Sequence, residues 1–261
     1  MNTELEPRDL NSSDSDIFGQ FQSRFAALQQ TEMSLEEYLD LCKADPLTYA
    51  SAAERMLHAI GEPEVINTRH DPRLSRIFAN RVVRRYPSFK EFYGMEEVIE
   101  NIVAYFRHAA QGLEERKQVL YLLGPVGSAK SSLAERLKAL MEQQPIYALK
   151  GSPINESPLG LFDPAQFGAS LEDKYGIPRR YLTGIASPWA TKRLAEFGGD
   201  LRKFRVVRLM PSTLNQIAIA KTEPGDENNQ DISALVGKVD IRMLNQFSQD
   251  DPDAYSFSGG L

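Results

Sequence analysis

The segment YLLGPVGSAKSSLAERL, at residues 121–137, contains the residues whose types and spacing could carry chemistry. It comes close to the pattern G-x-x-x-x-G-K-[ST], with Gly124, Lys130 and Ser131 at the required positions. Ala129 stands where the pattern has its second glycine. A triphosphate needs many N–H donors, positive charge and close approach to the backbone, which a glycine turn and a helix N-terminus supply. The spacing therefore predicts a phosphate-binding loop.

Each residue of this loop has an expected part in binding a nucleotide. Lys130 should reach the β- and γ-phosphates, and the Ser131 hydroxyl should hold Mg²⁺. Ala129 adds one methyl group where the chain is expected to enter a helix, and alanine is the best helix former. A damaged loop and a chance match remain the alternatives. The predicted cofactor-binding residues of the loop are Gly124, Pro125, Val126, Gly127, Ser128, Ala129, Lys130, Ser131 and Ser132.

The elements around the loop predict an α/β fold. The apolar run QVLYLL, at 118–123, is typical of a buried parallel strand, and the amphipathic pattern of 131–144 indicates a helix. IYAL at 146–149 and FRVVRLM at 204–210 are further strand candidates. Alternating strands and helices favour a parallel sheet with flanking helices. Before the loop, residues 92–112 predict a helix with Val98, Ile102 and Phe106 on one face, ending at Gly112.

We predict three regions along the chain. Residues 1–15 are polar and acidic, which is typical of a disordered tail, and residues 16–88 form a smaller, all-helical N-terminal region. The third region, 89–261, carries the loop. Within the second region, the segment 61–72 reads as a linker because prolines interrupt it. Three helices are predicted in the second region. The first is indicated by the spacing of Ile17, Phe18, Phe21, Phe25 and Leu28, and the second begins at the capping-box pair Ser34 and Glu37. The third begins at Asp45–Pro46 and ends at Gly61.

Charge and composition restrict the partners. The net charge of -6 argues against nucleic acid as the main partner, because phosphate backbones select basic surfaces. A basic cluster between Arg69 and Lys90 is either a solvated face or an anion-facing surface beside a nucleotide. Cys42, the single cysteine, is expected to be a buried structural thiol. No run is long enough to cross a bilayer, so we expect a cytoplasmic protein with no membrane partner.

Nucleotide hydrolysis also requires an acidic residue at the end of a neighbouring strand. FRVVRLM is followed by Pro211–Ser212, without an acid, and ALVGKVD at 234–240 is predicted to be a helix followed by a cap. The acidic segment 221–231 is predicted to be a solvated loop, with a metal-binding loop as the alternative. The sequence therefore shows no second acidic motif, and we assign no catalytic residue.

The chain resembles the bacterial PrkA-type serine protein kinases, whose N-terminal half is an AAA+ type P-loop domain. The resemblance rests on ANRVVRRYPSFKEFYGMEEVIENIV, HAAQGLEERKQVLYLLGPVGSAKSSLAERLK, YGIPRRYL, SPWATKRLAEFGGDLRKFRVVRL and IAIAKTEPGDENNQDISALVGKVDIR. It implies a P-loop NTPase sheet that binds ATP and Mg²⁺. It also implies that Tyr93 and Gly94, followed by Met95, form the hydrophobic-glycine element that contacts adenine. Family members usually carry glycine at the places of Ser128 and Ala129, whereas other AAA+ branches use Ala-Lys-Ser.

The resemblance also implies an activity. The chain is expected to be the ATP-binding module of an enzyme that phosphorylates serine on protein substrates. Family members are considerably longer, and their second acidic motif lies beyond the point matching Leu261, so an N-terminal piece with an incomplete sheet is expected. The alternatives are a nucleotide-dependent assembly or chaperone- or protease-like AAA+ module, which could form a homo-oligomer, and a non-catalytic fragment. Arg179 and Arg180 read either as surface charge or as groups acting in trans on a neighbour's phosphate.

Overall fold

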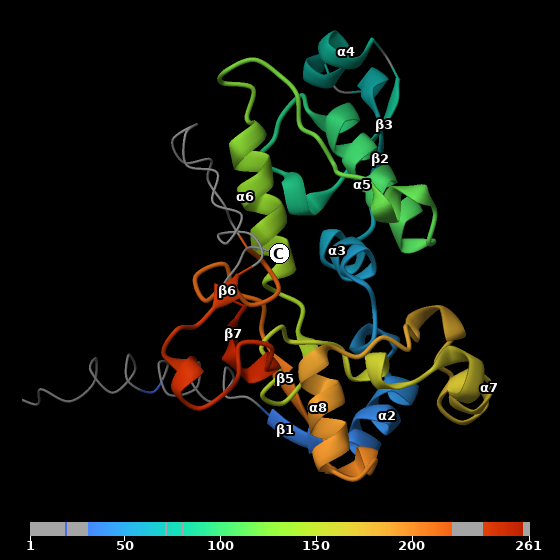
Figure 1. Ribbon diagram of the computed structural model, residues 1–261. Coiled ribbons are helices and arrows are strands. Elements are labelled where there is room, and N and C mark those ends of the chain that lie inside the picture. Colours follow the sequence, from blue (N-terminus) through green and yellow to red (C-terminus); the bar gives the residue numbers. More distant parts are fainter. Residues whose placement is uncertain (1–18, 20–30, 71, 80, 221–236, 258–261) are drawn as a thin grey trace, which may run out of the picture. The chain divides into compact units, whose positions relative to one another are not determined.

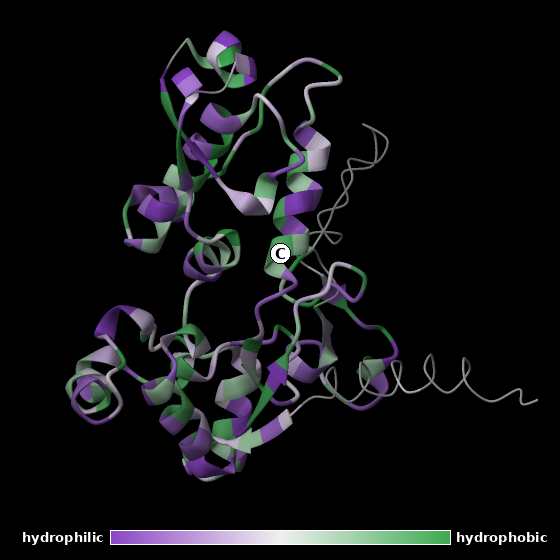
Figure 2. Ribbon diagram, turned by 180° about the vertical axis from the view of Figure 1, so that it is seen from behind, coloured by the Kyte–Doolittle hydropathy of each residue, from purple (hydrophilic) through white to green (hydrophobic). Residues whose placement is uncertain are grey.

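The fold is described from a computed structural model for residues 19, 31–70, 72–79, 81–220 and 237–257 (Figure 1). The predictions of a disordered tail at 1–15, of a helix with apolar spacing before residue 30 and of an acidic loop at 221–231 lie outside the described residues. The described residues from Glu32 onward form one compact unit. Its ribbons alternate between polar and apolar stretches, as expected for amphipathic elements (Figure 2).

The unit combines helices with short strands. The helices are α2 (Leu35–Ala44), α3 (Ala52–Ile60), α4 (Pro72–Phe78), α5 (Glu96–Ala110), α6 (Lys130–Met141), α7 (Pro164–Tyr175) and α8 (Pro188–Glu196). The strands are β1 (Thr31–Ser34), β2 (Glu64–Asn67), β3 (Val82–Arg85), β4 (Ile146–Leu149), β5 (Arg205–Leu209), β6 (Lys238–Val239) and β7 (Tyr255–Ser256). None of the helices in the described ranges is long and apolar enough to span a membrane.

Local capping signals position the first helices. The capping box predicted at the start of α2 is confirmed, since Ser34 Oγ accepts from the Glu37 N–H at 3.1 Å and the Glu37 carboxylate accepts from the Ser34 N–H at 2.6 Å. The next helix begins later than predicted. Asp45 caps only the short 3₁₀ turn Pro46–Thr48, and α3 starts after a second capping box at Ser51. α3 ends at Gly61, as expected.

The strands predicted at 146–149 and 204–210 are confirmed as β4 and β5, but the predicted parallel direction is wrong for this pair. They pair antiparallel, with Ile146 opposite Leu209, inside a sheet of order β1-β5-β4. Nearly all side chains of β4 and β5 are buried or half-buried. An apolar run results from burial on both faces, which parallel and antiparallel strands share, so the sequence does not specify the direction.

A hydrophobic cluster formed by three helices packs around α6, the helix that follows the phosphate-binding loop. The buried members of the cluster come from α3, α5, α6 and the segment before α5, and they are Met56, Ile60, Tyr86, Phe89, Ile99, Ile102, Val103, Leu133, Leu137 and Leu140. The face predicted for α5 is buried only in part. Val98 is 46% exposed, and the helix buries Ile99 and Val103 beside Ile102. Since α3 contacts both α5 and α6 within this cluster, the cluster fixes the helix that the loop enters.

Two other expectations are corrected. The N-terminal region is not all-helical, because β2 and β3 form an antiparallel pair with Glu64 opposite Arg85. β2 lies in the segment expected to be a linker. At the other end, Lys238–Val239 form a strand that pairs with β7, and not the predicted helix. Both strands are short and flanked by proline or glycine, which hides their pattern in the sequence.

The run at 118–123, which the sequence predicts to be a buried parallel strand, is not a strand in the structure. No pairing joins it to another described segment. Leu120 and Leu122 pack against the helical cluster, whereas Val119 is 88% exposed and Leu123 is 84% exposed. The alternation of buried and exposed side chains has the period of a strand, without the hydrogen-bonded neighbour.

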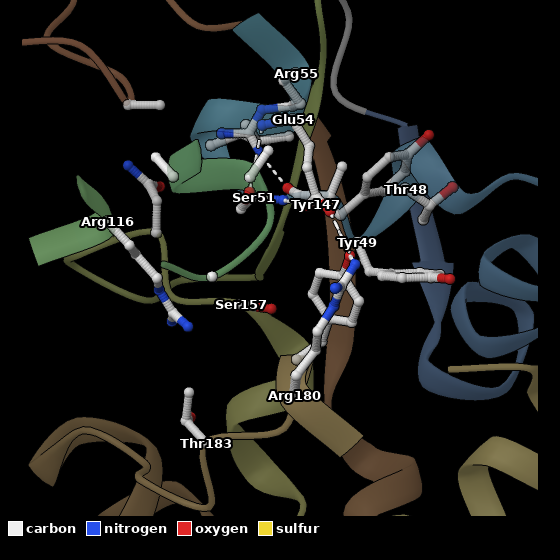
Figure 3. A pocket seen from close by; sticks show the side chains of 18 residues that line it. Thr48, Tyr49, Ser51, Glu54, Arg55, Arg116, Tyr147, Ser157, Arg180 and Thr183 are labelled. Atoms are coloured by element: carbon white, nitrogen blue, oxygen red, sulfur yellow. Dashed lines mark hydrogen bonds and ion pairs between the residues drawn. The ribbon is translucent and has the colours of Figure 1, made fainter. Parts of the chain in front are cut away.

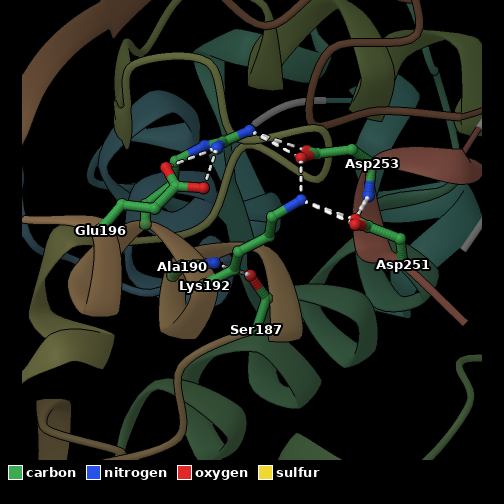
Figure 4. Close-up of polar contacts among 7 residues, drawn as sticks. Ser187, Ala190, Lys192, Glu196, Asp251 and Asp253 are labelled. Atoms are coloured by element: carbon green, nitrogen blue, oxygen red, sulfur yellow. Dashed lines mark hydrogen bonds and ion pairs between the residues drawn. The ribbon is translucent and has the colours of Figure 1, made fainter. Parts of the chain in front are cut away.

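An ionic network attaches the segment 251–256 to α8 (Figure 4). The Lys192 ammonium lies 2.7 Å from Asp251 Oδ1 and 2.6 Å from Asp253 Oδ2. Arg193 Nη2 lies 2.8 Å from Asp253 Oδ1. The hydrogen bond from Lys192 is the largest of the causes that hold the pKa of Asp251 below its usual value.

Cys42 is buried in the core beside Tyr38, with 1% of its surface exposed. Burial raises the pKa of its thiol to about 12, so the reactive thiolate is disfavoured. This confirms the prediction of a structural thiol.

Candidate functional site

The phosphate-binding loop borders a cavity of about 610 Å³. The loop contributes one wall, and the N-terminal half of α5 contributes the opposite one. The lining residues are Met95, Val98, Asn101, Ile102, Leu120, Tyr121, Leu122, Leu123, Gly124, Pro125, Gly127, Ser128, Ala129, Lys130 and Leu133. This volume and this mainly apolar lining with few polar groups are typical of small-molecule sites.

The backbone of the loop requires its glycines. A Cβ atom at Gly124 would lie 2.8 Å from Ser128 Oγ, so a side chain there would require the Ser128 hydroxyl or the loop to shift. Gly127 has a φ of 85°, in the left-handed region that glycine tolerates best. The two glycines therefore serve different purposes. Gly124 permits close packing, and Gly127 permits the turn.

Ala129 does not belong to the helix that comes after it. It is the N-cap residue of α6 and has left-handed angles, φ 57° and ψ 15°. The expectation that helix propensity makes alanine suitable here is wrong, because an L-residue with a Cβ atom is disfavoured in this conformation. Its position is one at which glycine would be unstrained.

Lys130 folds back over the loop. Its ammonium donates to the carbonyl oxygens of Gly124 and Pro125, each at 2.6 Å. It also lies 3.1 Å from Ser128 Oγ, whose hydroxyl donates to the Pro125 carbonyl at 2.8 Å. The lysine is therefore placed over the concave side of the loop, where an anionic oxygen could take the place of the carbonyl acceptors.

Ser131 and Ser132 occupy the first turn of α6 and are exposed. The backbone N–H groups of a first helical turn have no intrahelical acceptor and favour a bound anion. The described residues hold no cluster of three or more His, Cys, Asp or Glu side chains fit for a metal. A magnesium ion here would therefore combine the Ser131 hydroxyl with phosphate oxygens and water.

The hydrophobic-glycine element is only partly at the cavity. Tyr93 is 78% exposed, and neither it nor Gly94 lines the cavity, whereas Met95 does. Met95, Val98 and Ile102 recur at helical spacing from the N-cap of α5 onward, and the sequence prediction places the last two on one face of this helix without assigning them to the site. The same spacing could have identified them as a wall of the site.

Two arginines of the basic cluster pair with acids. Arg84 Nη1 lies 2.8 Å from Glu100 Oε1, and Arg81 Nη1 lies 3.3 Å from Glu97. These pairs support the interpretation of the basic cluster as a solvated face of the protein. Arg179 donates two hydrogen bonds to the backbone carbonyl of Pro164, at 2.8 and 3.2 Å. Its guanidinium is therefore tied to the chain that it belongs to.

Comparisons with known proteins agree with this geometry. The family described as "PrkA AAA domain" matches residues 33–261. The chain is 62% identical over 249 residues to "Serine/threonine kinase YeaG" of Escherichia coli strain K12, an alignment that covers 94% of this chain and 39% of that protein. It is 33% identical over 239 residues to "ATP-dependent protease PrkA" of Bacillus subtilis strain 168, covering 88% of this chain and 36% of that protein.

The chain thus spans about two fifths of the length of the curated relatives that it matches. No solved structure matches it. The family match covers the loop, both walls of its cavity and the helices α2 to α8. The chain belongs to the PrkA AAA domain family.

Proposed function

We propose that the chain is the ATP-binding AAA+ module of a serine protein kinase and binds ATP with Mg²⁺ at the loop 124–132. The observation that carries this proposal is the apposition of the loop and α5 around one cavity. The loop supplies Lys130 and the N-terminal turn of α6 for the phosphates. The apolar wall formed by Met95, Val98 and Ile102 is suited to a base.

In the complete protein, bound ATP would serve phosphorylation of protein serine. The name of the Escherichia coli relative, a serine/threonine kinase, supports this activity. None of the described residues that line the cavity is acidic. Phosphoryl transfer needs a group that positions the attacking oxygen. We therefore assign to this cavity the binding of ATP, and we assign the catalytic groups to none of the described residues.

A second candidate is a nucleotide-dependent module for protein turnover or assembly. The name of the Bacillus subtilis relative, an ATP-dependent protease, favours it. Both candidates share the nucleotide site and differ in the step that comes after ATP binding. Transfer of labelled γ-phosphate to serine supports the first, and ATP-dependent loss of a protein substrate supports the second. Homo-oligomerisation also stays a proposal, which light scattering with ATP would test.

The finer architecture is proposed as well. We infer a boundary near residue 88 between the N-terminal region and the AAA+ type domain. We also infer that, in the complete protein, 118–123 occupies the strand position ahead of the loop in a parallel P-loop sheet, whereas in this chain alone it has no strand partner among the described residues. Its alternating exposure supports this inference, because Val119, Tyr121 and Leu123 present apolar side chains that a neighbouring strand would cover.

The nucleotide site is tested by Lys130→Ala. We expect ATP affinity, measured by calorimetry with Mg²⁺, to fall by about 10- to 100-fold, since a hydrogen bond to a charged group contributes about 1.5–3 kcal/mol. Lys138→Ala is the matched control, because it removes one charge from the same helix and disrupts the ion pair with Glu135, away from the loop. Equal ATP affinities of the Lys130→Ala and Lys138→Ala proteins would overturn the assignment.

A further inference from the structure

A second cavity, of about 370 Å³, shares no lining residue with the cavity at the loop (Figure 3). It lies between the N-terminal part of α3, the end of α5 with the turn after it, β4 and the turn Arg179–Tyr181. The proposed nucleotide site does not use it. Its volume is at the lower end of the range for small-molecule sites.

Positive charge converges on this cavity. Arg55, Arg116 and Arg180 come from three separate elements and line it together with one acid, Glu54. Glu54 is already engaged, since its Oε1 accepts hydrogen bonds from Arg180 at 3.3 Å and from the Tyr181 hydroxyl. Within the described part of the chain, neither Arg55 nor Arg116 forms an ion pair. The lining therefore carries two guanidinium charges in excess, in a protein whose net charge is -6.

Arg55 is the more constrained of these two. Its Nη1 donates to the Ala50 carbonyl at 2.7 Å, but its Nε is buried and has no hydrogen-bond partner among the residues described. Burial is the first cause that lowers the pKa of its guanidinium. A buried donor without an acceptor is destabilising, and the one acid in the described lining, Glu54, which acts to raise the pKa of this guanidinium, already accepts hydrogen bonds from Arg180 and Tyr181.

Thr48 provides a second unpaired group. Only 6% of its surface is exposed, and its Oγ1 is buried without a partner in the described structure. Buried polar atoms are nearly always hydrogen-bonded, so two orphaned atoms in the lining of one cavity call for an explanation. Neither atom has appreciable accessible surface, so the orphaned atoms show only that acceptors are scarce around the lining. What favours an anion is the charge of Arg55, Arg116 and Arg180 in that lining.

We propose that this cavity is a binding site for a phosphate monoester, with Arg55 and Arg116 as the principal charge partners. A phosphate monoester carries close to two negative charges at neutral pH and three acceptor oxygens, which matches two unpaired guanidinium groups. The planar fork of arginine suits phosphate oxygens. The ester can come from a small phosphorylated molecule or from a phosphoserine side chain, and the cavity chemistry is the same for both.

The test uses the Lys130→Ala protein, so that the loop at 124–132 contributes little phosphate binding. Inorganic phosphate, glycerol 3-phosphate and a phosphoseryl hexapeptide are titrated by calorimetry. We expect saturable binding of phosphate, weakened about tenfold by an added Arg116→Gln because a charge-assisted hydrogen bond is lost. The ester that binds more tightly than phosphate identifies the source, and the unphosphorylated peptide should show no binding.

Arg202→Gln is the matched control. Arg202 is exposed, lies outside the cavity and pairs with Asp200 at 2.9 Å, so its loss removes the same charge elsewhere. Arg55→Lys keeps the buried charge but loses the fork, and it should weaken binding while leaving ATP affinity unchanged in the protein with Lys130 intact. Arg116 is exposed, so Arg116→Gln should fold even if Arg55→Lys does not. Absence of phosphate binding, or equal binding by the Arg116→Gln and Arg202→Gln proteins, would overturn the proposal.

Discussion

Ala129 holds a left-handed backbone conformation, φ 57°, at the start of α6. For a residue with a Cβ atom this conformation costs about 1–2 kcal/mol relative to a helical one. The strain lies one residue before Lys130, so it bears directly on the loop. At such a position the backbone angle, and not helix propensity, decides which residue is favourable.

Replacing Ala129 by glycine should remove this strain. We expect Ala129→Gly to raise the free energy of unfolding by about 0.5–1 kcal/mol, after subtraction of the greater unfolded-state entropy of glycine. Urea unfolding followed by circular dichroism measures the change. Ala134→Gly in the interior of α6 is the control and should lower stability by about 1 kcal/mol. Equal losses for both variants would show that Ala129 is unstrained.

Gly124 should not tolerate substitution, because of close packing rather than backbone strain. In Gly124→Ala the new Cβ would lie 2.8 Å from Ser128 Oγ, so the Ser128 hydroxyl or the loop must shift, and we expect weaker binding of a fluorescent ATP analogue. Ser128→Ala in the same chain removes that oxygen and should restore part of the affinity. If the double variant binds no better than Gly124→Ala, the contact with Ser128 is not the cause.

At the scale of elements, local chemistry predicts helix boundaries more closely than it predicts strand pairing. Ser34 and Glu37 specify the start of α2 through two hydrogen bonds within four residues, so their sequence spacing is sufficient. The pairing of β4 with β5 joins Ile146 to Leu209, across α7 and α8. No local pattern encodes that partner or its direction.

Amide hydrogen exchange of the segment 118–123 tests whether this segment is paired as a strand of a sheet. In the structure it has no strand partner among the described residues, so we expect the amides of Leu120 and Leu122 to exchange at rates near those of a free peptide. Amides of β4 and β5 serve as the internal reference and should be protected. Protection of 118–123 as strong as that of β5 would indicate that the segment is paired, as a parallel P-loop sheet requires.

At the scale of the molecule, the candidate site combines a loop that can be predicted from the sequence with a helical wall that cannot. The loop motif identifies Gly124 and Lys130 because its spacing is short and specific. The opposite wall is contributed by α5, whose orientation depends on packing in the helical cluster. Tyr93 is assigned by resemblance alone and lies outside the cavity, since the chain turns at Gly94 before α5 begins.

The attachment of 251–256 to α8 should depend on pH. Contact with Lys192 lowers the pKa of Asp251 below 3.8 in the folded state, so the stabilisation is present above that pH and is lost as the pH falls through the lowered value. We expect Asp251→Asn to lower the melting temperature at pH 7, with a difference from the wild type that shrinks below about pH 4. Asp250→Asn, at an exposed neighbour, is the control. A difference that is constant from pH 7 to pH 3 would contradict the pair.

The folded-back Lys130 has a thermodynamic consequence for any nucleotide. Its ammonium already has oxygen partners, two of them backbone carbonyls, so a phosphate would exchange partners with the loop and would not simply add one. The Gly124 and Pro125 carbonyls would then return to solvent. The ATP affinity therefore depends on the difference in free energy between the contacts of Lys130 with phosphate and its contacts with the loop. The loop oxygens compete with the phosphate oxygens for the same ammonium group.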